Sequence, residues 1–136
     1  MKYLLDTNIC VYLLNGEASL KKKVKEIGAY SLTVSNSVLA GLYFGAYKSK
    51  KVEENLKRIE LFKKNMAVFS DSEESAKLFG KIKADLSSKG TIIEDFDILI
   101  SSIAIANSCI LVTNNLEHFE RTLESLKLQN WLSRIP

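Results

Sequence analysis

Residues 97–115, DILISSIAIANSCILVTNN, decide the fold of this chain. No charged side chain occurs between Ile98 and Leu116, so a membrane span is one interpretation of this stretch. The other is a buried helix over Asp97–Asn107, followed by a buried strand over Ile110–Thr113. The polar residues within the stretch favour the helix and strand: Ser101, Ser102, Asn107, Ser108, Thr113, Asn114 and Asn115.

The same alternation of strand and helix runs through the rest of the chain. Short apolar runs predict strands at Lys2–Leu5, Ser31–Val34 and Ala67–Phe69, with a short edge strand at Lys127–Trp131. Helical spacing of apolar residues predicts the intervening helices, at about Asn8–Leu14, Ala18–Ile27, Val52–Lys64 and Ser72–Ser88, and around Gly41. This order implies an α/β fold, in which a short parallel sheet of four to five strands is flanked by helices on both faces.

The composition is that of one globular domain. The chain of 136 residues is long enough for one core and too short for two, so residues 1–136 are predicted to form a single domain. A net charge of +3 identifies no class of partner by itself. The basic stretch Lys48–Lys64 is interpreted as a solvated helix face, with contact to phosphate as the alternative.

The N-terminal sequence and the cysteines point to a cytoplasmic protein. The opening MKYLLDTN reaches Asp6 after an apolar run that is too short for a secretory signal. Cys10 and Cys109 each lie in an apolar stretch, without a CxxC motif or a histidine at zinc spacing. We therefore expect reduced, buried thiols, and a pairing of the two cysteines stays open.

Polar side chains follow two of the predicted strands at the point where each strand ends. Asp6 comes directly after the first strand, and residues 113–115, Thr-Asn-Asn, come after the fourth. Glu94, Asp95 and Asp97 stand where the buried helix begins. Ligands of open α/β sheets bind beyond the carboxyl ends of the strands, so we expect these groups to meet at one edge of the sheet.

A cluster of acids at one site repels itself unless a cation is present. Oxygen ligands suit Mg²⁺ or Mn²⁺, which activate water and stabilise charge on a phosphate oxygen. The alternative is structural: Asp6 and Asp97 cap helices and Asn115 is a turn residue. His118, the only histidine, is interpreted as a structural residue of a polar turn, with contact to substrate as the alternative.

Gly41 interrupts the pattern VLAGLYFGAY, residues 38–47. The apolar residues around it recur at helical spacing, so the glycine lies inside a helix. An interior glycine costs a helix roughly 1 kcal/mol relative to alanine. Nothing in the local sequence requires glycine at this position.

Four blocks of the chain resemble PIN-domain ribonuclease toxins of the VapC type. They are KYLLDTNICVYLLNG (2–16), LYFGAYKSK (42–50), IEDFDILISSIAIA (93–106) and LVTNNLEHFERTLESLKLQNW (111–131). The resemblance covers nearly the whole chain, in the order and spacing of that family. It implies a PIN-like three-layer fold and metal-dependent cleavage of RNA by the toxin of a type II toxin–antitoxin system.

The resemblance also implies partners and site residues. The partners are a VapB-type antitoxin, an RNA substrate and a second copy of the chain in a homodimer, and the cofactor is Mg²⁺ or Mn²⁺. Asp6 and Asp97 match the metal-binding acids, and Asn115 stands where many relatives have aspartate. Thr113 orients the loop, and Glu94 and Asp95 are candidate secondary ligands.

One position departs from the family pattern. The middle helix of the family usually reads Ala-Glu-Leu, whereas this chain reads Ala40-Gly41-Leu42 and lacks the glutamate. Either the chain is an attenuated or inactive form of the nuclease, or it works with Asp6, Asp97 and a neighbouring acid. A different class of function also stays open: a non-catalytic PIN-fold module that binds an antitoxin peptide or RNA.

Overall fold

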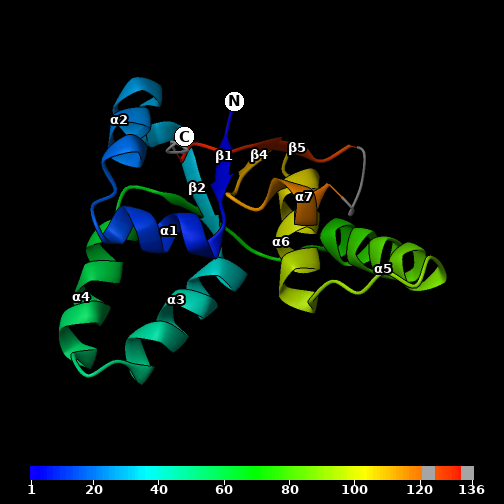
Figure 1. Ribbon diagram of the computed structural model, residues 1–136, viewed down its shortest axis with the longest axis horizontal. Coiled ribbons are helices and arrows are strands. Elements are labelled where there is room, and N and C mark those ends of the chain that lie inside the picture. The colour runs from blue at the N-terminus through cyan, green and yellow to red at the C-terminus, as the bar shows by residue number, and fades with distance from the viewer. Residues whose placement is uncertain (121–124, 133–136) are drawn as a thin grey trace.

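The computed structural model describes residues 1–120 and 125–132, and it contains the predicted parallel sheet (Figure 1). The strand order is β3-β2-β1-β4-β5, and every neighbouring pair is parallel. The strands are β1 (Tyr3–Leu5), β2 (Leu32–Ser35), β3 (Ala67–Phe69), β4 (Ile110–Val112) and β5 (Lys127–Gln129). The α/β expectation is confirmed, including the edge strand near the C-terminus.

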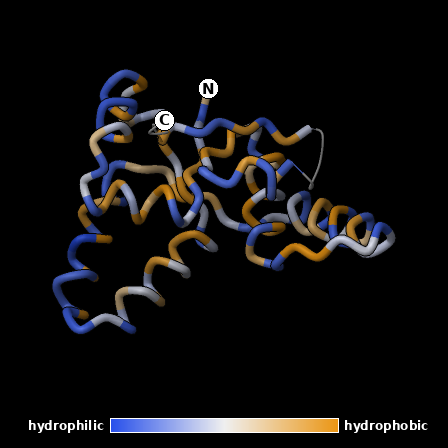
Figure 2. The backbone as a smooth tube through the Cα atoms, viewed as in Figure 1, coloured by the Kyte–Doolittle hydropathy of each residue, from blue (hydrophilic) through white to orange (hydrophobic). Residues whose placement is uncertain are grey.

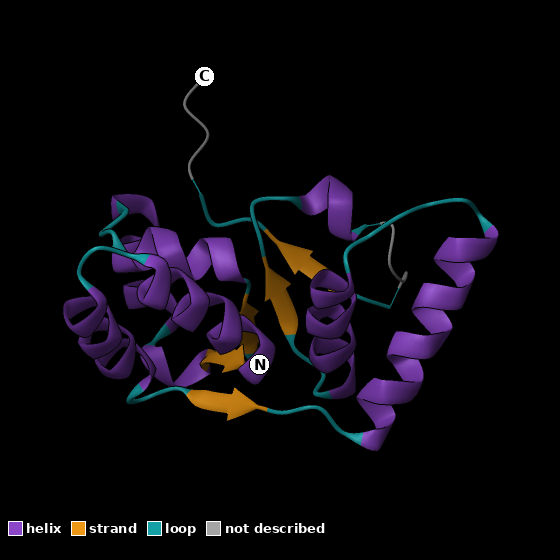
Figure 3. Cartoon of the chain, turned by 90° about the horizontal axis from the view of Figure 1, so that it is seen from below, coloured by secondary structure: helices purple, strands orange, loops and turns teal. Residues whose placement is uncertain are grey.

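Helices flank the sheet on both sides, as Figures 1 and 3 show. They are α1 (Thr7–Leu14), α2 (Ala18–Ile27), α3 (Asn36–Lys48), α4 (Val52–Lys63), α5 (Glu73–Ser88), α6 (Asp95–Ala106) and α7 (Leu116–Phe119). The helices α1 to α4 gather on one side of the strands, and α5 and α6 lie on the other (Figure 3).

Two details differ from the sequence prediction. Helix α6 begins at Asp95 rather than Asp97, so both acids lie in its first turn. A single helical turn, α7, replaces the polar turn expected around His118. A four-residue helix presents no repeating apolar pattern, so its sequence does not distinguish it from a turn.

The core lies on the central strands and on α6. The side chains of Leu4, Leu5, Leu111 and Val112 are fully buried, in keeping with strands covered on both faces. Figure 2 shows that the central strands and α6 are largely hydrophobic. A smaller cluster made of Ile82, Leu86, Ile93 and Ile98 joins α5 to α6.

The register between β1 and β4 determines which residues meet at the carboxyl edge of the sheet. β1 and β4 are aligned so that Leu5 lies opposite Val112, and the amide of Asp6 donates to the carbonyl of Val112 over 3.1 Å. The residues that follow the two strands, Asp6 and Thr113, therefore emerge side by side. The sheet edge expected from the sequence forms at this point.

Two alternatives left open by the sequence are resolved. None of the helices in the described ranges is long and apolar enough to cross a membrane. Cys10 and Cys109 are both buried and free, so they do not form a disulfide. Burial raises the pKa of the Cys10 thiol well above its ordinary value.

Two glycines far from the sheet edge test the local backbone. Gly80 lies exposed inside α5 with open space around it, so Gly80→Ala is expected to stabilise the fold by about 0.5–1 kcal/mol. Gly90 has a φ of +68°, and Gly90→Ala is expected to destabilise by about 1 kcal/mol. Urea unfolding of both variants measures the two opposite shifts, and shifts of equal sign would contradict this account.

Candidate functional site

Asp6 ends β1 and begins α1. Its side chain caps the helix, because Oδ1 accepts the Ile9 amide over 2.8 Å. The residue is only 5% exposed, and it also lines a small cavity at the carboxyl edge of the sheet. The capping and the functional interpretation of Asp6 are therefore compatible.

The cavity collects residues from three separate segments of the chain. It has a volume of about 110 Å³ and is lined by Asp6, Thr7, Asn8, Asp97, Ile100, Asn115, His118 and Phe119. Three of the residues singled out in the sequence, Asp6, Asp97 and Asn115, thus share one site. Thr113 is fully buried behind it, and its Oγ1 accepts the amide of Asn115 over 3.0 Å.

Asp97 lies in the first turn of α6 and contacts the single histidine. The distance from Asp97 Oδ2 to His118 Nε2 is 2.9 Å, and both side chains are partly buried. Sequence reasoning treated His118 as structural, but its ring lines the cavity. A signal was available in its position, because His118 stands one helical turn after Asn115.

Burial of Asp6 makes its charge costly. Desolvation raises the pKa of Asp6 above its ordinary value, and the negative charge of Asp97 raises it further. The Thr113 hydroxyl and the Ile9 amide act in the opposite direction, because both donate to the carboxylate. The site therefore brings together two acids whose repulsion a bound cation would reduce.

The other two acids of the sequence prediction lie outside the cavity. Glu94 is exposed at the N-cap position of α6 and makes no capping bond with its side chain. Asp95 is exposed and pairs with Lys83 of α5, with 2.9 Å between the nitrogen and the oxygen. Neither side chain is among those that line the site.

Gly41 lies on α3 against the start of α1. A Cβ at this position would lie 3.2 Å from Cγ2 of Thr7, which itself lines the cavity. A longer side chain at position 41 would therefore start directly beside the site. The contact is tight, so Thr7 would have to give by a few tenths of an ångström.

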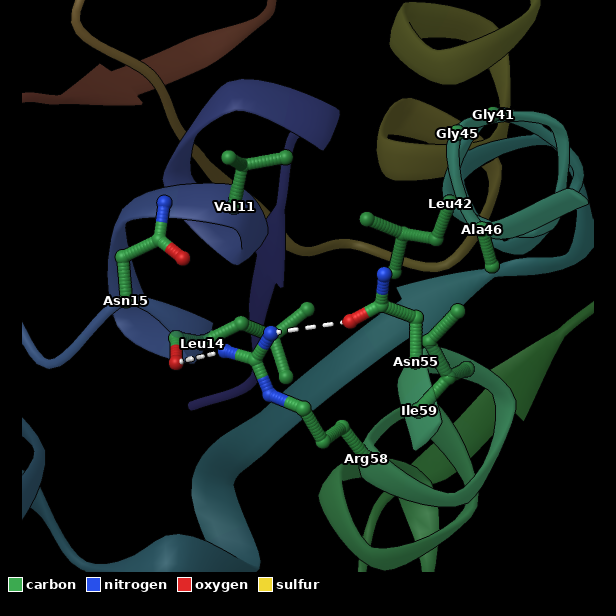
Figure 4. Close-up of a pocket in the computed structure, with 10 residues that line it drawn as sticks. All are labelled: Val11, Leu14, Asn15, Gly41, Leu42, Gly45, Ala46, Asn55, Arg58 and Ile59. Atoms are coloured by element: carbon green, nitrogen blue, oxygen red, sulfur yellow. Dashed lines mark hydrogen bonds between the residues drawn. The ribbon is translucent and has the colours of Figure 1, made fainter. Parts of the chain in front are cut away.

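Gly41 also lines a second cavity, between α1, α3 and α4 (Figure 4). Its volume is about 210 Å³, and its lining is largely apolar, including Val11, Leu42 and Ile59. Arg58 bridges α4 and α1 by donating to the carbonyl of Leu14. The two cavities lie on either side of the contact between positions 7 and 41.

The oxygen atoms that line the site suit a cation that keeps several water ligands, rather than one coordinated by protein side chains alone. Within residues 1–120 and 125–132, no group of three or more His, Cys, Asp or Glu side chains is arranged to hold a metal ion. Asp6 and Asp97 supply two carboxylates, and Asn115 supplies an amide. Mg²⁺ usually keeps several waters and binds through one or two carboxylates, so these residues fit it.

Comparison with known proteins agrees with this geometry. The family model of the PIN domain matches residues 3–123 of this chain. The chain belongs to the PIN-domain family. This PIN-domain chain is 39% identical to Ribonuclease VapC2 of Rickettsia felis over 133 residues, which cover 96% of this chain and 98% of that protein. It is 30% identical to the tRNA(fMet)-specific endonuclease VapC of Salmonella typhimurium, with 96% and 98% covered.

Solved structures give the same result for the PIN-domain fold. VapBC2 from Rickettsia felis bound to a promoter DNA fragment matches with a TM-score of 0.89 and 37% identity, over 96% of this chain and 99% of that one. DNA-bound VapBC from Salmonella typhimurium matches with a TM-score of 0.90 and 29% identity, over 97% and 99%. The PIN-like fold and the resemblance to VapC-type ribonucleases are confirmed.

The raised pKa of Asp6 predicts a gain of stability when its charge is removed. In the folded chain Asp6 binds its proton more tightly than in the unfolded chain, so stability falls as the pH rises from the ordinary carboxyl pKa through the raised one. Asp6→Asn keeps a capping side chain and carries no charge. It is therefore expected to raise the melting temperature at pH 7 without divalent cations, and to flatten its pH dependence.

Calorimetry between pH 4 and pH 7 in EDTA measures this effect. Asp71→Asn is the matched control, because Asp71 is exposed and its replacement changes the net charge equally. A melting temperature for Asp6→Asn at or below that of the unmodified chain would contradict a costly charge at Asp6.

Proposed function

We propose that this chain is the toxin of a type II toxin–antitoxin pair and a metal-dependent endoribonuclease of the cytoplasm. The observation that carries the proposal is the meeting of Asp6 and Asp97 in one cavity at the carboxyl edge of the sheet. The family supports it, since close relatives are VapC ribonucleases. We further propose that one domain spans residues 1–136.

The chain's own residues hold the two acids in place. The Ile9 amide and the Thr113 hydroxyl fix Asp6, and His118 contacts Asp97. The bound Mg²⁺ or Mn²⁺ would supply an activated water and stabilise charge on the phosphate. Asn115 offers an amide at the exposed side of the cavity, where it is placed to contact the cation's water or the RNA.

Gly41 attenuates this activity in our proposal. The glutamate that the family usually carries there would add a third carboxylate beside Thr7. Its absence leaves fewer charges to hold the cation, and removing one member of a coupled catalytic set often costs orders of magnitude in rate. The fold is not affected, because position 41 is only partly buried and the helix α3 continues through it.

A VapB-type antitoxin is the proposed protein partner, and a homodimer is the proposed assembly. Solved relatives are VapBC complexes bound to DNA, and one of the DNA fragments comes from their promoter. A VapC of Salmonella typhimurium is named as specific for tRNA(fMet), so initiator tRNA is the first RNA to test.

A non-catalytic module that binds an antitoxin peptide or RNA is the second candidate function. The observation that favours it is the combination of Gly41 with the apolar cavity between α1, α3 and α4. Two exposed aromatic side chains on α3, Phe44 and Tyr47, add apolar surface for a partner helix.

Restoring the carboxylate separates the two functions. We expect Gly41→Glu to cleave initiator tRNA or a mixed structured RNA about 10³-fold faster than the unmodified chain in Mn²⁺, with EDTA abolishing the cleavage. Gly41→Gln is the matched control, because it adds the same bulk against Thr7 without the charge. A denaturing gel that follows RNA fragments over time measures the rates.

Further variants of Gly41→Glu test the two acids. Asp6→Asn and Asp97→Asn in that background are expected to remove the cleavage. Equal cleavage by Gly41→Glu and the unmodified chain would show that the site works without the third carboxylate. No cleavage by either would favour the binding module.

A further inference from the structure

We propose that His118 is a positioning residue for Asp97: its Nε2–H holds Oδ2, so that the other carboxylate oxygen faces the cation. The inference rests on the proposed function and gives a role in the site to a residue that the sequence favoured as structural. It is carried by the 2.9 Å contact between the two side chains and by their shared place in the cavity lining.

The ring of His118 is itself held in orientation. It belongs to α7, whose last residue Phe119 is buried, and the two rings meet edge to face with centroids 5.4 Å apart. The Phe119 amide donates to the carbonyl of Asn115 over 3.3 Å, which closes the single turn of α7. Because Phe119 restrains the ring of His118, this ring can in turn restrain the carboxylate of Asp97.

The two acids of the site are supported differently. Asp6 receives two donors, the Ile9 amide in the first turns of α1 and the Thr113 hydroxyl directly after β4. Asp97 stands at the partly exposed start of α6, where the imidazole is the donor that the geometry provides to its side chain. Loss of the imidazole would leave this carboxylate free to rotate, while Asp6 would keep its orientation.

The contact also defines the tautomer of His118. A carboxylate oxygen only accepts, so Nε2 carries the proton and Nδ1 is unprotonated in the neutral ring. Hydrogen-bonded partners of metal-binding side chains typically contribute 10- to 100-fold to metal affinity. With two carboxylates in the cavity lining, the orientation of each one has a direct effect on cation binding.

The sequence provides a clean probe, because His118 is the only histidine. A long-range ¹H–¹⁵N spectrum of the full-length, metal-free chain at pH 7.5 therefore contains one imidazole. We expect a proton on Nε2 in the unmodified chain, because this nitrogen faces the carboxylate, and a loss of that preference in Asp97→Ala. A ring with its proton on Nδ1 and none on Nε2 in the unmodified chain would overturn the proposal.

Cation affinity provides the second readout. Titration of the full chain with Mn²⁺, followed by electron paramagnetic resonance, is expected to show about 10- to 100-fold weaker binding for His118→Ala. His118→Gln is expected to recover most of the affinity, because its amide nitrogen can donate from a similar position. Glu117→Ala is the matched control, since Glu117 is an exposed residue of the same helical turn.

The outcomes separate this inference from the proposed function. If Asp6→Asn loses Mn²⁺ while His118→Ala keeps full affinity and only melts earlier, His118 is a structural tie and the positioning role is wrong. If the unmodified chain binds no Mn²⁺, both proposals fail. Equal weakening by His118→Ala and His118→Gln would also overturn the donor role.

Discussion

The pairing of β1 with β4 is the constraint on which the rest of the site depends. These strands lie at the centre of the sheet, and their side chains are buried on both faces. A slip of one residue would turn every buried side chain to the opposite face and against different helices, so packing on the two faces fixes the register. The register then brings Asp6 next to Thr113, which places a buried carboxylate beside a hydroxyl donor. The chemistry of the edge thus follows from the packing of residues that take no part in it.

The cavity combines groups whose arrangement has an electrostatic cost for the folded chain. Asp6 is desolvated by the fold and further disfavoured by Asp97, while the Ile9 amide and Thr113 offset only part of that effect. Such opposition between stability and function is typical of sites that bind a charged ligand. Gly41 adds no charge to this balance, because it has no side chain at the place where it faces Thr7.

The sequence predicted the sheet, its helices and the meeting of Asp6, Asp97 and Asn115, because apolar periodicity and strand-end positions follow general rules of α/β folds. It did not predict His118, because α7 is a single turn without a periodic pattern. The sequence also did not show which way the acidic side chains at the start of α6 point. Asp95 pairs with Lys83, whereas Asp97 contacts His118. The two acids are two positions apart on the helix, so their side chains point in different directions.

The edge strands bear on how this chain behaves among its own copies. β3 and β5 close the sheet at opposite ends, and each is only three residues long. Val68 of β3 is exposed, and an open strand edge of this kind is a template for pairing with another chain. Its length of only three residues disfavours such edge-to-edge pairing. The shortness of this edge therefore lowers the tendency of the chain to pair with its own copies through the sheet.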